Sequence, residues 1–213
     1  MTPQILYQDE FVFVVCKPIG IVSEESADQT GLADLLRLQN SGYVGVVDRL
    51  DRGVGGVMVY AKSKTAAARL SAAVQAHALQ KIYLAVVHGK PQKEADTLVD
   101  LLYHDRIKNK TYVVDRERRG VKQAILDYET LATKEHDTHG TISKLRITLH
   151  TGRTHQIRVK MASRGLPLVG DNKYGAKDRC DVALFCHTLS FPHPKTGTRM
   201  TFSLDPEGDI WAF

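Results

Sequence analysis

The chain of 213 residues has no long apolar run and no basic leader. Its longest uninterrupted apolar stretch is FVFVVC at residues 11–16, far short of the roughly 18–20 residues that cross a bilayer. The first ten residues, MTPQILYQDE, carry two acidic and no basic residue, so they lack the pattern of a signal or transit peptide. With 43% hydrophobic and 25% charged residues, the composition excludes a disordered chain and predicts a globular, cytoplasmic protein without membrane contact.

Cysteine is also scarce, and no C-x-x-C motif is present. The three cysteines are Cys16, Cys180 and Cys186, and we expect all of them to be free thiols. Neither the spacing of His150 and His155 nor that of Cys180 with Cys186 and His187 matches a zinc motif. The sequence contains no phosphate-binding G-x-x-x-x-G-K-[ST] loop and no G-x-S-x-G nucleophile motif. We therefore expect neither a metal nor a cofactor.

Hydrophobic periodicity predicts a mixed α+β chain with much antiparallel sheet. Ser63 is placed to cap a helix, and Gly165 is placed to end one. Apolar runs and alternating patterns predict strands at 5–7, 11–15, 44–47, 57–61 and 82–89. They predict antiparallel sheet over 97–150 and mainly strand and loop from 171 to 213. Helices are predicted over 31–40, 64–79 and 154–164.

The first unusual stretch is DRLDRGVGG at residues 48–56, between two apolar runs. It places two carboxylates and two guanidinium groups within five positions, and three glycines within the next four. Its glycines would let the backbone approach a ligand closely. The alternative is a solvated turn with local ion pairs, and the residues alone leave both interpretations open.

The second stretch is TGRTHQIRVKMASR at residues 151–164, which has four Lys or Arg and no acidic residue. On a helix, Ile157 and Met161 would pack inward, and Arg158, Lys160 and Arg164 would lie near solvent. The lack of compensating acidic residues favours phosphate binding over a merely solvated face.

A third basic segment runs from residue 106 to residue 122. It contains seven Lys or Arg and two acidic residues, with Tyr112 among them. Two interpretations stay open for this segment, an RNA-contacting arm and an exposed hairpin stabilised by salt bridges.

Five motifs, in order, resemble those of the RluA/RsuA-type RNA pseudouridine synthases, and more closely the RluA branch. They are ILYQDEFVFVVCKPIGI (5–21), VVDRLDRGVGGVMVYAKS (46–63), QKIYLAVVHGKP (80–91), LHTGRTHQIRVKMASRGLPLVGDNKYG (149–175) and LFCHTLSFPHPKTG (184–197). The resemblance implies the pseudouridine synthase core, a long bent and mainly antiparallel sheet with flanking helices and a central RNA cleft. It also implies an isomerase that converts a uridine of tRNA or rRNA to pseudouridine without metal or cofactor.

The same resemblance implies the site residues. Asp51 would be the catalytic carboxylate, Tyr83 would stack on the flipped base, and Arg153 would keep Asp51 ionised. Whether Asp51 bonds to the sugar or removes a sugar proton to give a glycal stays open. The candidates for RNA contact are Arg49, Arg52, His155, Gln156, Arg158, Lys160 and Arg164.

The chain departs from the family pattern near the catalytic position. Asp48 stands where histidine is usual, Gly53, Val54 and Gly55 replace polar residues, and Lys160 and Leu166 occupy positions where histidine is frequent. Asp51 keeps its flanking Arg49, Leu50 and Arg52, so we expect the chemistry to persist and the substrate preference to differ.

We expect one catalytic domain over residues 1–213, a monomer with no separate N-terminal RNA-binding domain and no obligate protein partner. Two other functions stay open. One is a non-catalytic RNA-binding module of the same fold. The other is a metal-dependent phosphoesterase using Asp48, Asp51 and Asp171.

Overall fold

The computed structural model describes residues 3–25, 29–40 and 42–213, and the chain divides into two compact units. Unit 1 is formed by Met1–Lys81 and Phe185–Pro206, and unit 2 by Ile82–Leu184 and Glu207–Phe213. Each unit has its own set of hydrogen-bonded strands and its own buried apolar residues.

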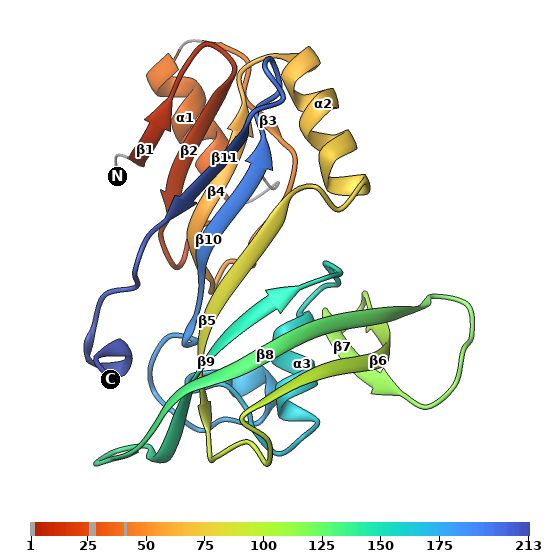
Figure 1. Ribbon diagram of the computed structural model, residues 1–213, viewed down its shortest axis with the longest axis vertical. Coiled ribbons are helices and arrows are strands. Elements are labelled where there is room, and N and C mark those ends of the chain that lie inside the picture. The colour runs from red at the N-terminus through yellow and green to blue at the C-terminus, as the bar shows by residue number, and fades with distance from the viewer. Residues whose placement is uncertain (1–2, 26–28, 41) are drawn as a thin grey trace. The chain divides into compact units, whose positions relative to one another are not determined.

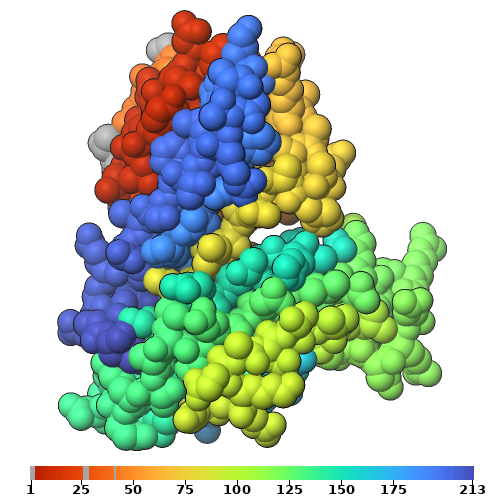
Figure 2. Space-filling view, in the orientation of Figure 1, coloured from red at the N-terminus to blue at the C-terminus, as the bar shows by residue number. Residues whose placement is uncertain are grey.

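The sheet of unit 1 is built mainly from antiparallel strands (Figure 1). Its strands are β1 (Gln4–Gln8), β2 (Val12–Lys17), β3 (Gly45–Val46), β4 (Gly55–Ala61), β10 (Leu184–Pro192) and β11 (Arg199–Ser203). β4 lies between β2 and β10, β1 extends the sheet beyond β2, and β11 pairs with β10. The contact of β10 with β4 is parallel, and β3 pairs with the end of β4. Figure 2 shows the β10–β11 hairpin at the surface of this unit.

Two helices accompany this sheet, α1 (Leu32–Asn40) and α2 (Lys64–Gln75). Ser63 caps α2 as predicted, because its side chain accepts a hydrogen bond of 3.1 Å from the N–H of Ala66. Leu70 of α2 is fully buried with alternate residues of β2 and β4. Apart from the half-buried Cys16, the remaining residues of β2 and β4 are buried too, and the strands therefore read as continuous apolar runs in the sequence.

Gly56 allows the parallel contact between β4 and β10. Its φ is positive, and a Cβ at this position would overlap the backbone of Cys186. The space beside Gly55 is likewise filled by the ring of Phe185. The interpretation that these two glycines make room for a ligand is therefore wrong, since β10 occupies that space.

The sheet of unit 2 is antiparallel throughout, as predicted for residues 97–150. Its strands are β5 (Gln80–His88), β6 (Ala95–Asp105), β7 (Lys110–Val114), β8 (Val121–His136) and β9 (Gly140–Leu149). They lie in the order β5-β9-β8-β6-β7. The pairs β6–β7 and β8–β9 join strands that are consecutive in the sequence, whereas the pairs β6–β8 and β5–β9 do not.

One α-helix, α3 (Gln156–Ala162), packs on this sheet through Val159, which is buried with Leu102 and Ala124. It is shorter than the predicted 154–164 because His155 has a left-handed backbone, with a φ of 54°. Gly165 also has a positive φ, as expected after a helix end. Two short 3-10 helices follow, η1 (Asn172–Tyr174) and η2 (Asp209–Trp211).

The described structure confirms the expected mixed α/β class with a mostly antiparallel sheet. Cys180 is an exposed free thiol, as predicted. Among the described residues, no helix has both the length and the apolar character of a membrane span.

Candidate active site

The loop that carries Asp51, residues 48–54 between β3 and β4, is tied to the turn that follows β2. Ser23 is buried, and its hydroxyl accepts a hydrogen bond from the N–H of Leu50 (3.1 Å) and donates one to the Leu50 carbonyl (2.9 Å). Leu50 is itself buried, with 6% of its surface exposed. The residue before Asp51 is thus fixed by both backbone groups and by its side chain.

The residue after Asp51 is fixed in a similar way. Gly20 and Arg52 bond reciprocally, because the Gly20 N–H donates to the Arg52 carbonyl (2.8 Å) and the Arg52 Nε donates to the Gly20 carbonyl (3.0 Å). The Val54 N–H closes a turn on the Asp51 carbonyl at 3.0 Å. Asp51, half-buried between these anchors, therefore sits on a backbone with little freedom.

Beneath the Asp51 loop lies a fully buried lysine, Lys17, the last residue of β2. Its ammonium donates to the carbonyl oxygens of Pro18 (3.0 Å), Ile21 (2.7 Å) and Arg52 (3.4 Å). Burial lowers the pKa of Lys17 to about 8, and the nearby negative charge of Asp51 opposes that shift. Lys17 therefore joins the turn after β2 to the Asp51 loop, and its charge acts on Asp51.

Sequence reasoning missed this role of Lys17. The available signal was a lysine directly after the apolar run FVFVVC, where a charge is costly to bury unless it is bonded.

The other charged residues of this loop are paired. Asp48 forms an ion pair with Lys81, and burial lowers the pKa of that lysine. Arg49 is exposed and forms an ion pair of 2.6 Å with Glu24. Arg52 is exposed as well, so the two arginines expected to contact RNA both lie at the surface of unit 1.

In unit 2, Tyr83 lies on β5 opposite Ile147 of β9, and 6% of its surface is exposed. Arg153 precedes α3 and is half-buried. Its Nε donates to the Gln123 carbonyl at 3.1 Å, which fixes the start of its guanidinium group.

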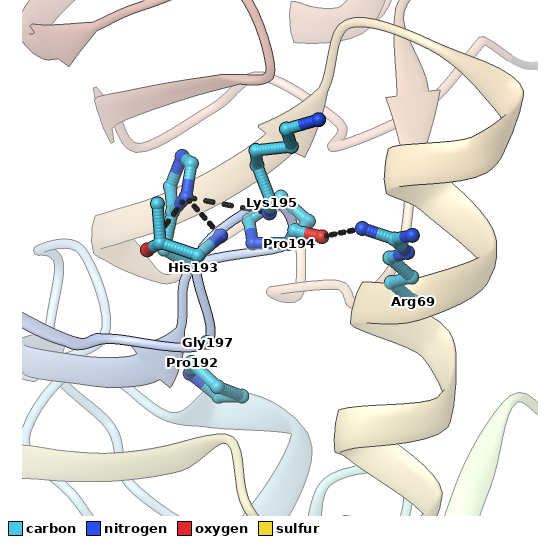
Figure 3. A pocket seen from close by; sticks show the side chains of 7 residues that line it. Arg69, Pro192, His193, Pro194, Lys195 and Gly197 are labelled. Atoms are coloured by element: carbon cyan, nitrogen blue, oxygen red, sulfur yellow. Dashed lines mark hydrogen bonds between the residues drawn. The ribbon is translucent and has the colours of Figure 1, made fainter.

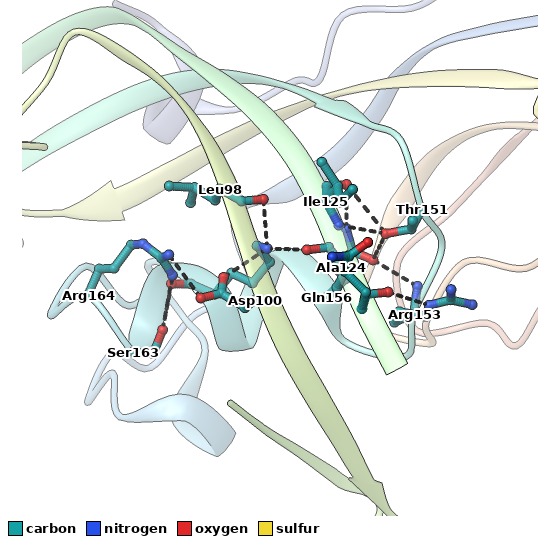
Figure 4. Close-up of polar contacts among 11 residues, drawn as sticks. Leu98, Asp100, Ala124, Ile125, Thr151, Arg153, Gln156, Ser163 and Arg164 are labelled. Carbon is teal, nitrogen blue, oxygen red and sulfur yellow. Dashed lines mark hydrogen bonds and ion pairs between the residues drawn. The ribbon is translucent and has the colours of Figure 1, made fainter. Parts of the chain in front are cut away.

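Gln156 organises the loop that carries Arg153 (Figure 4). Its Oε1 accepts hydrogen bonds from the Thr151 hydroxyl (2.9 Å) and the Arg153 N–H (3.0 Å), and its Nε2 donates to the Ile125 carbonyl (3.0 Å). With 3% of its surface exposed, Gln156 positions the loop, and its predicted contact with RNA stays a prediction.

The prediction that Lys160 lies near solvent is wrong. Lys160 is fully buried, and its ammonium donates to the carbonyls of Leu98 (2.9 Å) and Ala124 (2.7 Å) and pairs with Asp100 (2.8 Å). Figure 4 shows these partners, with Arg164 also directed to Asp100. Lys160 thus joins α3 to β6 and β8, and its three donors are all used inside the protein. Helical periodicity missed this because α3 packs across two strands.

Arg158 and His155 are held by neighbours within unit 2. Arg158 forms a bidentate ion pair with the fully buried Asp171, at 2.7 Å and 2.8 Å. His155 is 9% exposed, and its Nδ1 lies 2.9 Å from the hydroxyl of Tyr174. Asp171 pairs with Arg158 and Asp48 with Lys81, so two of the three carboxylates of the phosphoesterase hypothesis are neutralised by basic side chains.

The basic segment 106–122 forms the turn before β7, β7 itself and the loop before β8. In Figure 2 it projects from the surface of unit 2. Among the residues that the structure describes, none of its seven Lys or Arg forms an ion pair with a carboxylate. The hypothesis of a salt-bridged hairpin is therefore wrong, and unpaired cations with exposed Tyr112 favour an anionic partner.

A hollow of about 320 Å³ on unit 1 is lined by Arg69 of α2 and residues 192–197 (Figure 3). Arg69 donates to the Pro194 carbonyl at 2.6 Å, and His193 bonds Asp9 through Nε2 at 2.9 Å. The Nδ1 of His193 accepts from the N–H groups of Lys195 and Thr196. These bonds explain the conformation of the loop 192–197 without a ligand, and we assign no ligand to the hollow.

Comparison with known proteins decides the family. The family model described as RNA pseudouridylate synthase matches residues 11–163, which include the Asp51 loop and all of α3. The chain belongs to this family. It is 34% identical to ribosomal large subunit pseudouridine synthase D of Pseudomonas aeruginosa, over 98% of this chain and 70% of that protein. An uncharacterized RNA pseudouridine synthase of Aquifex aeolicus is 32% identical, over 94% of this chain and 68% of its own length.

A solved structure agrees with the fold of this synthase. Human RNA pseudouridylate synthase domain containing 1 matches with a TM-score of 0.82 and 23% identity, covering 96% of this chain and 84% of that one. The recognition from five motifs is thereby confirmed, as is the predicted activity: the chain is an RNA pseudouridine synthase, an isomerase.

Proposed function

We propose that Asp51 is the catalytic carboxylate of this synthase and that its substrate is a uridine of ribosomal RNA. The observation that carries the assignment to Asp51 is its loop, which Ser23, Gly20 and the buried ammonium of Lys17 hold from three sides. A carboxylate fixed before substrate arrives pays little reorganisation energy during the reaction. Asp48, the other carboxylate of the loop, is neutralised by Lys81.

The isomerisation needs one carboxylate and no redox partner. The bond from ribose to the ring nitrogen breaks with its electron pair on uracil, and positive charge develops on the sugar, as in glycoside cleavage. Asp51 stabilises that charge, either by bonding to the sugar or by removing a neighbouring proton. The uracil then turns, a bond forms from ribose to a ring carbon, and that carbon loses its proton while the ring nitrogen that left the sugar gains one. If Asp51 has removed a sugar proton, that proton returns to the sugar as the new bond forms. Atoms balance, because product and substrate are isomers.

We assign Tyr83 and Arg153 to the same nucleotide by resemblance to the family. The uridine has to leave its stack to reach Asp51, and the ring of Tyr83 would replace part of the lost stacking, a contact worth about 1–3 kcal/mol. The guanidinium of Arg153 would keep Asp51 ionised. Both assignments gain support from local order, since Tyr83 is held in β5 and Arg153 by Gln123 and Gln156.

We assign RNA contact to exposed cationic side chains. These are Arg49, Arg52 and Arg164 together with the basic segment 106–122. The choice of ribosomal RNA rests on the names of relatives, among them synthase D of Pseudomonas aeruginosa and ribosomal large subunit pseudouridine synthase C of Pasteurella multocida, which is 34% identical over 96% of this chain and 65% of that protein. Action on ribosomal RNA agrees with a cytoplasmic, monomeric enzyme.

The experiment compares two RNA pools from a strain that lacks this gene. Purified protein is incubated with the ribosomal RNA and, separately, with the transfer RNA, and pseudouridines are mapped at nucleotide resolution. We expect new pseudouridine at one or a few ribosomal positions and none in transfer RNA. Modification of transfer RNA alone would overturn the substrate assignment, and modification of neither pool would favour the non-catalytic RNA-binding module.

A further inference from the structure

A cluster of two histidines and one aspartate in unit 2 lies outside the residues assigned to catalysis. His88 ends β5, His139 lies in the turn between β8 and β9, and Asp178 lies in the loop after η1. The Nε2 of His88 lies 2.8 Å from one carboxylate oxygen of Asp178, and the Nδ1 of His139 lies 2.8 Å from the other. Three segments far apart in the sequence thus converge on one carboxylate.

We propose that His88, His139 and Asp178 bind a divalent transition-metal ion of the Zn²⁺ class. Their ligand atoms all lie within 4.8 Å of one another. Two imidazole nitrogens and a carboxylate oxygen form a common ligand set for such ions, with bonds of about 2.0–2.2 Å. Two ligand atoms on one tetrahedral zinc lie about 3.3 Å apart, so the 2.8 Å contacts need to open by only a few tenths of an ångström.

Hydrogen-bond accounting at His88 favours a cation between these groups. Its Nδ1 lies 3.3 Å from the carbonyl oxygen of His139, and its Nε2 faces the Asp178 carboxylate. Both neighbours are acceptors, and a neutral imidazole has a single N–H, so either a second proton or a metal ion stands between Nε2 and Asp178. If Nδ1 donates to the carbonyl, Nε2 is left to bind a metal ion, which is the usual arrangement of a metal-bound histidine.

The surroundings also hold the ligands in place while leaving the cluster accessible. The Gly170 N–H donates to the Asp178 carboxylate at 2.9 Å, and the side chain of Asn172 donates to the Asp178 carbonyl at 3.0 Å. The side chains of His88, His139 and Asp178 are 25%, 16% and 10% exposed, so an ion can enter from solvent. His136 packs against His139, but its Nδ1 bonds Thr138, and we leave it out of the ligand set.

The other histidine–aspartate pairs show what this cluster adds. His150 bonds Asp127 at 2.6 Å, His187 bonds Asp205 at 3.1 Å and His193 bonds Asp9 at 2.9 Å, each as one histidine with one carboxylate. Among the described residues, the grouping of three potential ligands occurs at His88, His139 and Asp178. Sequence reasoning missed it because the three residues stand in separate motifs with no zinc spacing, and the fold alone brings them together. The bound ion would link β5, the β8–β9 turn and the loop after η1.

The test is to titrate chelator-treated full-length protein with ZnCl₂. Calorimetry measures the binding of Zn²⁺, and thermal denaturation measures the unfolding temperature. We expect one Zn²⁺ per chain and a higher unfolding temperature with Zn²⁺ but not with Mg²⁺. Asp178→Asn and His139→Gln should each weaken binding at least about tenfold. His150→Gln, a matched change in a two-residue pair, and Cys180→Ser, which removes the exposed thiol nearby, should bind as the wild type does.

Absence of stoichiometric binding to the wild-type protein would overturn the proposal and leave a hydrogen-bonded His–Asp–His network. Binding that survives both Asp178→Asn and His139→Gln, or that Cys180→Ser abolishes, would overturn it as well. If Asp178→Asn fails to fold, His139→Gln, a change in a surface turn, decides. Co²⁺ serves as a second probe, and its visible spectrum should report nitrogen and oxygen ligands without sulfur.

Discussion

At the scale of single residues, buried ammonium groups organise both units of the molecule. Lys17 bonds three carbonyl oxygens under the Asp51 loop, and Lys160 bonds two carbonyls and Asp100 under α3. Each lysine replaces lost hydration with oxygen partners, which is the condition for burying a charge. Neither lysine is available to RNA in this arrangement.

The titration of Lys17 gives a prediction about pH. Its pKa is about 8 in the folded protein and 10.5 when solvated, so between these values the unfolded chain binds the extra proton. Stability then rises with pH over that window. Relative to Lys17→Met, the wild-type free energy of unfolding should increase from pH 8 to pH 10, measured by urea denaturation. A difference that does not change with pH would contradict the lowered pKa of Lys17.

The burial of Lys160 predicts a loss of stability rather than of RNA affinity. Lys160→Met leaves two carbonyls without their donor and Asp100 with Arg164 as its remaining partner, and we expect a loss of about 3 kcal/mol in the free energy of unfolding. Lys90→Met, at an exposed position outside the basic segment 106–122, should change it by less than about 0.5 kcal/mol. The slope of log RNA affinity against log salt should be the same in the two variants. A reduced slope in Lys160→Met alone would show that Lys160 contacts a phosphate.

At the scale of elements, the signals that proved reliable were the local ones. Ser63 predicts the start of α2, and Gly165 follows the end of α3, because caps act within one turn. The apolar runs predict the strands of unit 1 but not their partners. The shortened α3 and the inward Lys160 depend on how a helix crosses two strands, which no local pattern contains.

The cap of α2 can be tested on its own. Ser63→Ala removes the acceptor of the Ala66 N–H, and we expect a loss of about 1 kcal/mol in the free energy of unfolding. Thr65→Ala, an exposed change inside the same helix, should cost nothing or stabilise slightly. Equal effects of the two changes in chemical denaturation would contradict the capping role.

The basic segment 106–122 gives a prediction about salt. Removing Arg116 and Arg119 together should weaken RNA binding and reduce the slope of log affinity against log salt by about 1–2, at roughly 0.7–0.9 per phosphate contact. The matched control is Lys90→Ala with Lys93→Ala, two cations of unit 2 that are already paired with Glu94 and Asp96. An unchanged slope in the Arg116 and Arg119 variant would remove this segment from the RNA interface.

At the scale of the whole molecule, ordered motifs predict the family, and physical patterning predicts a mixed, mainly antiparallel fold. What the sequence left undetermined is which polar residues face inward. Gln156, Arg158 and Lys160 stand in a basic stretch that indicates RNA contact, yet each bonds within unit 2. The His88, His139 and Asp178 cluster is the opposite case, since residues with no motif in common meet only through tertiary structure.

The most direct test of the whole account is pseudouridine formation by Asp51→Asn. The change keeps the size of the side chain and removes its charge, so the sugar loses its stabilising carboxylate while RNA contacts made by other residues persist. We predict no detectable pseudouridine in ribosomal RNA from a deletion strain, RNA affinity within about twofold of wild type, and full activity for Asp205→Asn, an exposed change in the same unit. Turnover by Asp51→Asn comparable to that of Asp205→Asn would contradict the account.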